Sequence, residues 1–452
     1  MKPFDISKFR KSITKAVPGM SSGFHDPVDW ISTGNLALNF LIAGDFNRGI
    51  PLGRVTCLAG ESGSGKSFIA SGNLVRHAQQ QGILPIVLDS ENALDSDWLQ
   101  ALDVDISEDK LLRFGVSMID EVAKFISEFM KGYREQYADV PYEERQKVLF
   151  VIDSLGMLLT PTDKDQFEKG DMKGDMGRKP KALTALVRNS VNLLAGNPVG
   201  LIATNHTYAS QDMFDPDDKI SGGQGFIYAS SIVVAMRKLK LKEDEEGNKI
   251  TDIRGIRAAC KVMKTRFAKP FESVQIKIPY DTGMDPYSGC LDLFEKAGVI
   301  VKEGNKLKYT TAKGEEIKEF RKGWGPDNLQ KVINDFKEND NNLSIEAGSI
   351  QAELGGRVDI QEQIRVSTGL STITAEEASY DEEAGVLQIP KSVVFENPDL
   401  IIFGENAKIL IKEKTAVIEG ADYQILSIPA RGTASQIKVE NGKNIELGGV
   451  TY

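Results

Sequence analysis

The segment GESGSGKS at residues 60–67 constrains the fold of this chain more than any other part of its sequence. It fits the pattern GxxxxGK[ST] and lies between a run that favours a strand, 54–59, and a run that favours a helix, 67–81. In such a loop the backbone N–H groups converge on phosphate oxygens, and glycines let the backbone approach closely. We therefore expect Lys66 to contact the β- and γ-phosphates of a nucleotide and Ser67 to coordinate Mg²⁺. The expected nucleotide-binding residues are Gly60, Glu61, Ser62, Gly63, Ser64, Gly65, Lys66 and Ser67.

Apolar runs alternate with longer helical segments after residue 30. Continuous apolar strands joined by helices are typical of a mostly parallel sheet that is buried on both faces, so the expected class is α/β. The charged run 238–249 lies between two expected strands, and its EEGN sequence predicts a hairpin tip. The expected strands are 54–59, 85–88, 147–152, 199–204, 231–236, 255–263 and 273–278, and the expected helices are 67–81, 118–137 and 180–194.

Carboxylates follow two of these expected strands. Asp153 ends the strand 147–152 and would stand beside Mg²⁺. A buried strand can end in aspartate by chance, but the phosphate loop favours a metal ligand here. Asp89-Ser90-Glu91 follows the strand 85–88, which we expect next to the phosphate-loop strand. Glu91 would then be a general base acting on water at a γ-phosphate; alternatively, it is a solvated turn acid or a helix cap.

Composition limits the remaining classes. The chain has 55 basic and 65 acidic residues, a net charge of −10, which argues against an overall basic coat but allows a local nucleic-acid site. Cys57, Cys260 and Cys290 are widely spaced, so neither a disulfide framework nor a zinc knuckle is expected. No apolar run approaches the roughly 18–20 residues that span a bilayer, and no secretory signal is visible. We expect a cytoplasmic protein with no membrane partner.

Two long polar segments, 161–181 and 206–226, follow strand ends and do not fit a compact core. Long loops in such places often carry function. Their cations could meet phosphates, while Met213 and Phe214 could separate or stack bases. On the residues alone, two ordinary surface loops are the simpler interpretation. The candidate DNA-binding residues are Lys173, Arg178, Lys179, Met213, Phe214, Lys219, Gly222 and Gly223.

Motifs between residues 28 and 340 resemble those of RecA-type strand-exchange recombinases, and they occur in family order. WISTGNL (30–36) and LDSENALD (88–95) resemble bacterial RecA. DSLG (153–156), NHTY (205–208) and MDPYSG (284–289) resemble the T4-type phage UvsX recombinases. The resemblance implies a RecA-like P-loop ATPase core that uses ATP and Mg²⁺.

The resemblance also implies roles for single residues. Glu91 matches the catalytic glutamate of the family, and Trp98 falls where an aromatic side chain covers adenine, although ordinary helix packing is the alternative. His206 would lie close to the γ-phosphate and could report the nucleotide state to the second DNA-binding loop. Otherwise it is a satisfied polar side chain, and the spacing of the histidines predicts no metal site. Lys264 and Arg266 would reach the γ-phosphate of the neighbouring subunit, in the manner of an arginine finger.

The implied function is that of an ATP-dependent recombinase, which coats single-stranded DNA as a helical filament and pairs it with a homologous duplex. It would act in recombination, repair and recombination-dependent replication. The implied partners are single-stranded and duplex DNA, further copies of this chain, a loading mediator and a single-strand-binding protein. Two alternatives are a hexameric RecA-fold helicase and a non-catalytic DNA-binding accessory paralogue. The NHTY motif favours the recombinase over the helicase, and the intact nucleotide-site residues argue against the paralogue.

Four domains are expected. Residues 1–29 would form an oligomerisation helix and linker that docks on the next subunit, 30–285 the ATPase core, and 286–342 a small α+β module. Residues 343–452 would form an acidic β-rich region of unknown role. This region has 9 basic and 17 acidic residues, a net charge of −8, so the preceding 342 residues carry only −2 of the total. It is either a packing or solubility module or an acidic regulator that competes with DNA phosphates.

Overall fold

The computed structural model describes residues 26–170, 177–208, 219–223, 225–243, 249–311, 314–341, 344–346, 349–352, 357–368, 371–381, 384–397, 400–410, 415–425, 430–440 and 444–451. The chain divides into two compact units, Met1–Lys302 and Glu303–Tyr452, which we describe separately. This division lies inside the expected module 286–342, and the four expected domains stay predictions. The expected helix before residue 26 and the hairpin tip at 245–248 lie outside the described residues.

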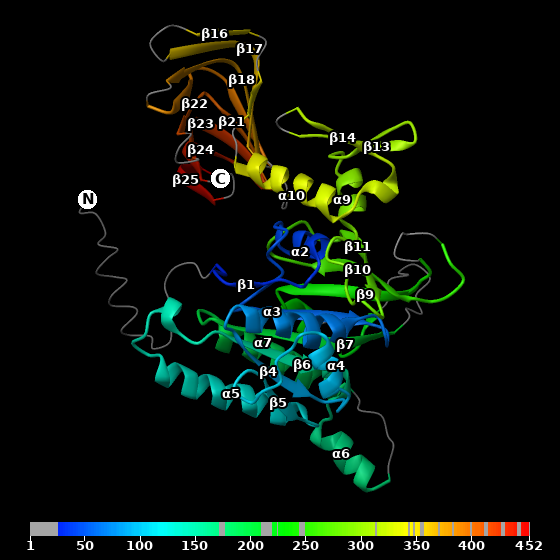
Figure 1. Ribbon diagram of the computed structural model, residues 1–452. Coiled ribbons are helices and arrows are strands. Elements are labelled where there is room, and N and C mark those ends of the chain that lie inside the picture. The colour runs from blue at the N-terminus through cyan, green and yellow to red at the C-terminus, as the bar shows by residue number, and fades with distance from the viewer. Residues whose placement is uncertain are drawn as a thin grey trace, which may run out of the picture. The chain divides into compact units, whose positions relative to one another are not determined.

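The first unit is built around a nine-stranded sheet of order β11-β10-β9-β3-β7-β6-β4-β5, with β8 paired to β7 (Figure 1). The strands from β9 to β5 in this order are parallel, and β10 and β11 are antiparallel to their neighbours. The mostly parallel α/β sheet expected from the sequence is therefore confirmed. The strands are β3 (Val55–Gly60), β4 (Leu84–Asp89), β5 (Leu112–Gly115), β6 (Val148–Asp153), β7 (Val199–Tyr208), β8 (Lys219–Ile220), β9 (Ile232–Leu241), β10 (Gly255–Lys264) and β11 (Ser273–Pro279), and β1 (Trp30–Ile31) pairs with β2 (Ile50–Pro51) apart from this sheet.

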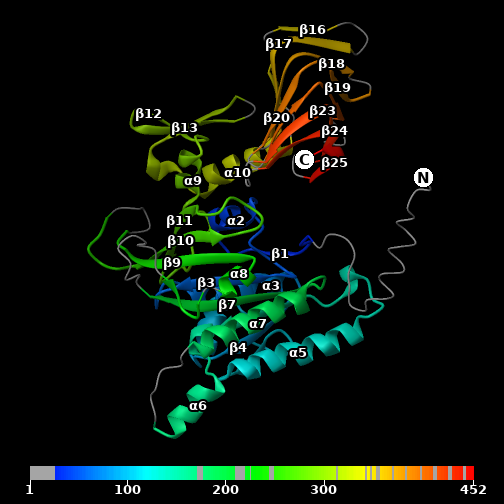
Figure 2. The ribbon, with the colours of Figure 1, turned by 180° about the vertical axis from the view of Figure 1, so that it is seen from behind.

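Helices cover both faces of the sheet: α5 and α7 lie on one face and α3 and α4 on the other (Figures 1 and 2). Alternate residues of β3, such as Cys57, share a core cluster with Ile126 of α5 and Leu186 of α7. Every residue of β3 and β6 is buried, as expected for strands covered on both sides. The helices are α2 (Leu36–Ala43), α3 (Leu74–Gln80), α4 (Ser96–Ala101), α5 (Ile119–Gln136), α6 (Pro161–Glu168), α7 (Arg178–Leu194), α8 (Gly225–Ala229) and α9 (Cys290–Lys296), with single helical turns η2 (Tyr142–Glu144) and η3 (Leu155–Met157).

Three segments differ from their sequence-based expectation. The expected helix 67–81 begins as a π-helical stretch, η1 (Phe68–Asn73), before α3 continues it. The segment 161–181 was expected to be a loop, and this is wrong for residues 161–168, which form α6, and for residues 178–181, which begin α7. The other expected loop, 206–226, includes the end of β7, the strand β8 and the start of α8. Thr160 caps α6 in a reciprocal capping box with Asp163, and proline occupies the first turn, where its missing N–H costs nothing.

The second unit is β-rich. Its main sheet has the order β15-β17-β18-β19-β22-β23-β21-β20, all antiparallel, with β16 on β17, β24 on β23 and β25 on β24. Leu387, Ile402, Ile418 and Ile437 are buried in its core, in line with the β-rich C-terminal region expected from the sequence. The elements are β12 (Val301–Glu303), which spans the division, β13 (Lys306–Thr310), β14 (Glu316–Glu319), η4 (Arg321–Gly323), α10 (Pro326–Asn341), β15 (Ser344–Glu346), β16 (Ser349–Ala352), β17 (Arg357–Thr368), β18 (Ser371–Asp381), β19 (Val386–Ile389), β20 (Val393–Glu396), β21 (Leu400–Gly404), β22 (Asn406–Leu410), β23 (Thr415–Ile425), β24 (Ala430–Glu440) and β25 (Asn444–Thr451).

In the part of the chain that the structure describes, every helix is too short or too polar to cross a membrane.

Candidate active site

The phosphate-loop segment joins β3 to η1 at the carboxyl end of the parallel sheet. The ammonium of Lys66 lies inside the loop, where Nζ donates to the carbonyl oxygens of Gly60 at 2.9 Å and Glu61 at 2.8 Å. Gly63 and Gly65 have φ angles of 73° and 93°, in the left-handed region that favours glycine. The loop thus encloses a cation with its own backbone.

The neighbouring strand β9 fixes this loop in place. A Cβ atom on Gly60 would lie 2.3 Å from the carbonyl oxygen of Met236, so only glycine fits there without a shift. The backbone N–H of Lys238 donates to Oε1 of Glu61 at 2.7 Å, and its Nζ donates to the carbonyl oxygen of Ser62 at 3.0 Å. Lys238 was not predicted from the sequence, because no local pattern marks a residue of one strand as a neighbour of this loop.

The electrostatics of Lys66 reflect its burial. Desolvation lowers the pKa of Lys66, while the carboxylates of Asp153, Glu91 and Glu61 act in the opposite direction and Lys238 adds to the lowering. The side chain is buried, with 7% of its surface exposed. Among the described residues no carboxylate forms a direct ion pair with this amine, so a phosphate would supply counter-charge to a cation that has lost water.

Asp153 is the last residue of β6 and is almost completely buried. Its Oδ2 atom accepts a hydrogen bond from the Ser71 hydroxyl at 2.9 Å, and its Oδ1 atom accepts one from the Thr204 hydroxyl at 2.5 Å. These bonds join the carboxylate to η1 and to β7 and fix its orientation. Asp153 was expected here from the sequence, whereas the two hydroxyls were not.

Glu91 follows β4, and the strand order corrects one expectation. The strand β4 is not next to the phosphate-loop strand β3, because β7 and β6 lie between them.

Asp89 supports the turn that brings Glu91 toward the site. The Asp89 carboxylate accepts hydrogen bonds from the backbone N–H groups of Glu91 at 3.1 Å and Leu94 at 3.4 Å. Arg113, on the short strand β5, donates to Oδ2 of Asp89 at 2.6 Å. The sequence did not predict β5, so this support was missed.

The side chain of Glu91 contacts the ends of two other strands. Its Oε1 atom accepts a hydrogen bond from the Ser154 hydroxyl at 2.8 Å and lies 3.3 Å from Nε2 of His206. About a third of each of the Glu91 and His206 side chains is exposed, with 33% and 36% of their surfaces accessible. The structure therefore brings together Lys66, Asp153, Glu91 and His206 at the carboxyl ends of four parallel strands, the usual position of ligands in open α/β sheets.

The residues present fit a magnesium nucleotide. Within the described residues, no group of three or more His, Cys, Asp or Glu side chains could hold a metal ion. Mg²⁺ usually takes one or two protein ligands and completes its shell with phosphate oxygens and water, which suits Ser67 and Asp153. Ser64, the only buried serine of the loop among the described residues, has an Oγ atom without a hydrogen-bond partner. A bound phosphate would extend a polar network that the loop leaves incomplete.

Trp98 lies on α4, is half-buried, and lies beside η1, the helical stretch that follows the phosphate loop. Its ring packs edge-on against Phe68 with a centroid separation of 6.2 Å and an interplanar angle of 70°. Leu102, one turn further on, lies 2.6 Å from where a Cβ atom on Gly72 would stand. These contacts accord with helix packing, and a role for Trp98 beside adenine stays a prediction.

Lys264 ends β10 and Arg266 follows it. Nζ of Lys264 donates to the carbonyl oxygens of Tyr228 at 2.6 Å and Ile227 at 3.2 Å, both on α8. Burial and then the charge of Arg266 lower the pKa of Lys264, so the two cations are close. Arg266 itself is exposed. Within this protomer Lys264 is thus bound to the C-terminal carbonyls of α8.

The candidate DNA-binding residues are only partly within the described chain. Lys173, Met213 and Phe214 lie outside the described residues. Arg178 donates to the Thr162 hydroxyl at 3.0 Å, and Lys179 donates to the carbonyl oxygen of Gly156 at 2.7 Å. Both residues belong to the first turn of α7 rather than to a loop.

The second candidate DNA segment is anchored to β7 at its far end. Lys219 pairs with Tyr208 in the antiparallel β7–β8 contact. A Cβ atom on Gly222 would lie 2.7 Å from Leu183, and one on Gly223 would lie 3.2 Å from Pro180. Both glycines therefore sit tightly against α7, which accounts for them by packing; a DNA contact stays a prediction.

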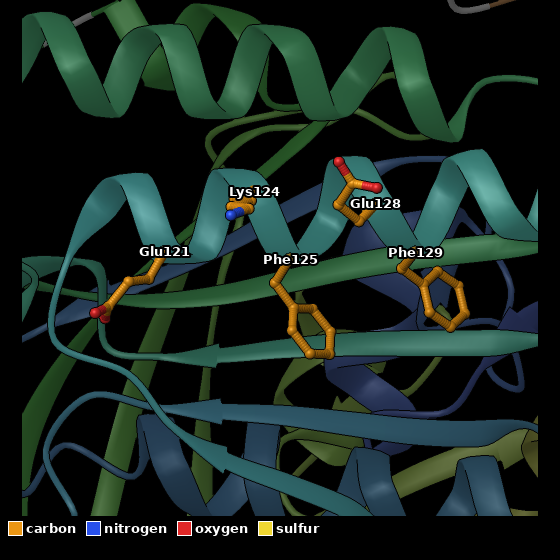
Figure 3. A pocket seen from close by; sticks show the side chains of 5 residues that line it. All are labelled: Glu121, Lys124, Phe125, Glu128 and Phe129. Atoms are coloured by element: carbon orange, nitrogen blue, oxygen red, sulfur yellow. The ribbon is translucent and has the colours of Figure 1, made fainter.

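A separate pocket of about 500 Å³ lies on α5, away from the phosphate loop (Figure 3). The rings of Phe125 and Phe129 point toward the sheet, and Phe125 packs against Phe114 of β5 at a centroid distance of 4.9 Å. No residue of the phosphate loop lines this pocket. Its lining residues are Glu121, Lys124, Phe125, Glu128 and Phe129.

Known proteins that are similar to this chain belong to one group. The RecA N-terminal domain family matches residues 7–285 of the chain. Protein RecA of Rhodococcus jostii is 27% identical over 319 residues, which cover 70% of this chain and 82% of that protein. Protein RecA of Chlorobium chlorochromatii is 28% identical over 307 residues, covering 68% and 77%. The recombination and repair protein of Enterobacteria phage T4 is 26% identical over 286 residues, covering 63% and 68%.

Proposed function

The chain belongs to the RecA family, and on this premise we propose that it is a DNA-dependent ATPase that acts as a strand-exchange recombinase. It forms helical filaments on single-stranded DNA and pairs that strand with a homologous duplex in recombination, repair and recombination-dependent replication. The observation that carries the proposal is the convergence of Lys66, Asp153, Glu91 and His206 at one edge of the sheet. A paralogue without ATPase activity would not require these four side chains to lie together.

Each member of the set has a separate task. Lys66 places a positive charge inside the phosphate loop, where it binds β- and γ-phosphate oxygens in exchange for its backbone carbonyls. Ser67 and the oriented carboxylate of Asp153 would hold Mg²⁺, which would supply positive charge to the phosphates when bound. Glu91, anchored through Oε1, positions a water molecule for attack on the γ-phosphate and accepts its proton.

His206 supports a connection between nucleotide and DNA. It contacts Glu91 on one side, and its backbone carbonyl accepts from the N–H of Ser221 at 2.9 Å. The neighbouring Asn205 side chain donates to the carbonyl oxygen of Ser221 at 2.7 Å. Ser221, directly after β8, is thus hydrogen-bonded to the residue that contacts the proposed base. We propose that the second candidate DNA segment, with Met213 and Phe214, binds DNA and senses nucleotide state through His206.

Lys264 and Arg266 extend the site to a neighbouring subunit in this proposal. They would stabilise the charge that develops on the γ-phosphate bound by the next copy of the chain. Lys264 must then exchange the carbonyl oxygens of Ile227 and Tyr228 for phosphate oxygens. ATP would in this way join adjacent subunits, with residues 1–29 docking on the next subunit and a mediator and a single-strand-binding protein as further partners.

Two measurements on the full chain test the proposal. Electron microscopy with single-stranded DNA and ATP should show open helical filaments, whereas closed rings of six subunits would favour the hexameric helicase. A strand-exchange assay between circular single-stranded DNA and a homologous linear duplex should yield ATP-dependent product. A heterologous duplex is the matched control and should yield none. Filaments or DNA binding without any exchange and without ATP turnover would favour the accessory paralogue.

A further inference from the structure

Two serines join the ends of β4 and β6 beside the proposed base. The register pairs Asp89 with Asp153, so the next residues, Ser90 and Ser154, are neighbours. The Ser90 hydroxyl donates to the carbonyl oxygen of Ser154 at 2.7 Å and accepts from the backbone N–H of Ser154 at 2.8 Å. The backbone N–H of Ser90 donates to the carbonyl oxygen of Asp153 at 2.8 Å. One hydroxyl therefore fixes both polar backbone groups of Ser154.

With its backbone held, Ser154 presents its own hydroxyl to the base. Oγ of Ser154 donates to Oε1 of Glu91 at 2.8 Å, and only 1% of the surface of Ser154 is exposed. Hydrogen bonds from a buried donor to a carboxylate are stronger than those between neutral groups. Nε2 of His206 lies 3.3 Å from the same oxygen. In the described part of the chain, the contacts of the Glu91 carboxylate thus converge on Oε1.

We propose that Ser154 is a positioning residue for Glu91, and that Ser90 acts by holding Ser154. Anchoring Oε1 turns the carboxylate so that Oε2 faces the water that attacks the γ-phosphate. This inference rests on the proposed function, because it takes Glu91 as the base. The hydrogen bond between Ser154 and Glu91 suits this role, because a general base is effective when its side chain is held within a narrow range of orientations.

A purely structural role for these serines predicts a different outcome. If Ser154 only stabilised the turn, its removal would lower the midpoint of thermal unfolding and weaken nucleotide binding together with turnover. If it orients Glu91, its removal lowers kcat and leaves nucleotide affinity unchanged. The effect must then also depend on the presence of the Glu91 carboxylate. A double-mutant cycle measures this dependence directly.

The experiment compares Ser154→Ala, Glu91→Gln and the double variant of the full chain. We expect Ser154→Ala to lower DNA-dependent kcat about tenfold to hundredfold, the usual range for a lost hydrogen bond to a charged group. The affinity for a fluorescent, non-hydrolysed ATP analogue should stay within about twofold, as for retained uniform binding. In the Glu91→Gln background the same change should lower kcat by less than about twofold, since coupled residues are not additive. Ser190→Ala is the matched control, because Ser190 is buried on α7 and, among the described residues, its hydroxyl donates to the carbonyl oxygen of Leu186 in the same helix.

The possible outcomes separate this inference from the proposed function. An equal loss of kcat from Ser154→Ala in both backgrounds, or no loss in either, would overturn the positioning role and leave the recombinase intact. Wild-type turnover by Glu91→Gln would instead remove Glu91 as the base. Should Ser154→Ala fail to fold, Ser90→Ala takes its place in the same cycle. It is expected to give a smaller loss of kcat that disappears in the Glu91→Gln background, and a loss that persists there would count against the proposal.

Discussion

Nε2 of His206 lies 3.3 Å from Oε1 of Glu91, although the two residues lie at the carboxyl ends of β7 and β4, which are not neighbours in the sheet. The strand β6 lies between β7 and β4, and Ser154 at its end contributes the hydroxyl that also contacts Glu91. Glu91, the proposed base, therefore lies in one cluster of contacts with Ser154, directly after β6, and His206, at the start of the second candidate DNA segment. In the proposed function, a change in the nucleotide that moves Glu91 would act on His206 of β7 through this contact.

The Lys66→Ala variant should lose ATP hydrolysis and nucleotide-dependent assembly. Lys66 is buried inside the phosphate loop, and its removal would take away the ammonium that we expect to contact the β- and γ-phosphates. The measurement is steady-state phosphate release on single-stranded DNA, together with sedimentation in the presence of ATP. Lys124→Ala on α5 is the control and should behave like the parent chain. Unchanged turnover of Lys66→Ala would contradict the assignment of the nucleotide site.

The Glu91→Gln variant should separate binding from chemistry. Glutamine keeps the shape of the side chain and can still accept the hydrogen bond from Ser154, but it cannot take a proton. We expect ATP and DNA binding to be retained while hydrolysis falls about 10²–10⁴-fold. Nucleotide binding and single-turnover hydrolysis measure the two effects, and Glu128→Gln on α5 serves as a surface control. A loss of ATP binding as large as that of Lys66→Ala would mean that Glu91 has a structural role.

A third prediction concerns catalysis between subunits. Arg266→Ala protomers should bind nucleotide but hydrolyse it poorly, because the cation of the neighbouring subunit is missing. Arg266 is the better variant, since Lys264→Ala also removes the hydrogen bonds to Ile227 and Tyr228 within its own protomer. Lys264→Ala should show the same loss of hydrolysis, with thermal unfolding recorded to detect any damage to α8.

Mixing gives the decisive measurement for this prediction. When Arg266→Ala and Glu91→Gln protomers are combined, some interfaces pair an intact Glu91 with an intact Arg266 from the neighbour. Turnover should therefore rise above the average of the two inactive proteins, and it should peak near equal proportions. If turnover at every mixing ratio equals the weighted average of the two proteins, these cations act within their own subunit or have no role in catalysis.

The local parts of the site were predictable from the sequence, whereas its assembly was not. The phosphate loop and the strand ending in Asp153 are contiguous patterns of glycine, apolar and acidic residues, and such patterns determine local structure directly. The order of strands depends on long-range packing, which is why β4 was wrongly expected beside β3. The supports of the site were missed for the same reason: Arg113 lies on a four-residue strand with little periodicity, and Thr204 reaches Asp153 only across the sheet.

Helix α6 shows the opposite case, in which a local signal was present but was not used. The sequence Thr160-Pro161-Thr162-Asp163 contains a capping residue, a proline at the first helical position and an acidic residue that completes the box. The richness of the following segment in lysine and glycine suggested a loop instead. Residues 171–176 lie outside the described chain, so the expectation of a DNA-binding segment there stays a prediction.

The acidic region 343–452 should tune access to DNA without being needed for hydrolysis. Its net charge of −8 lies on β-rich sequence outside every nucleotide and DNA motif. A chain truncated after Asn342 should fold, hydrolyse ATP and form filaments, and it should bind duplex DNA more tightly than the full chain at low salt. The advantage should shrink as salt rises, because exposed charges more than about 8–10 Å apart are largely screened near physiological ionic strength. A duplex-affinity titration of both forms at several salt concentrations makes the measurement. Equal affinities at low salt would exclude the electrostatic role and favour a partner-binding or packing module, whereas an insoluble truncated chain would show that this region belongs to the folded core.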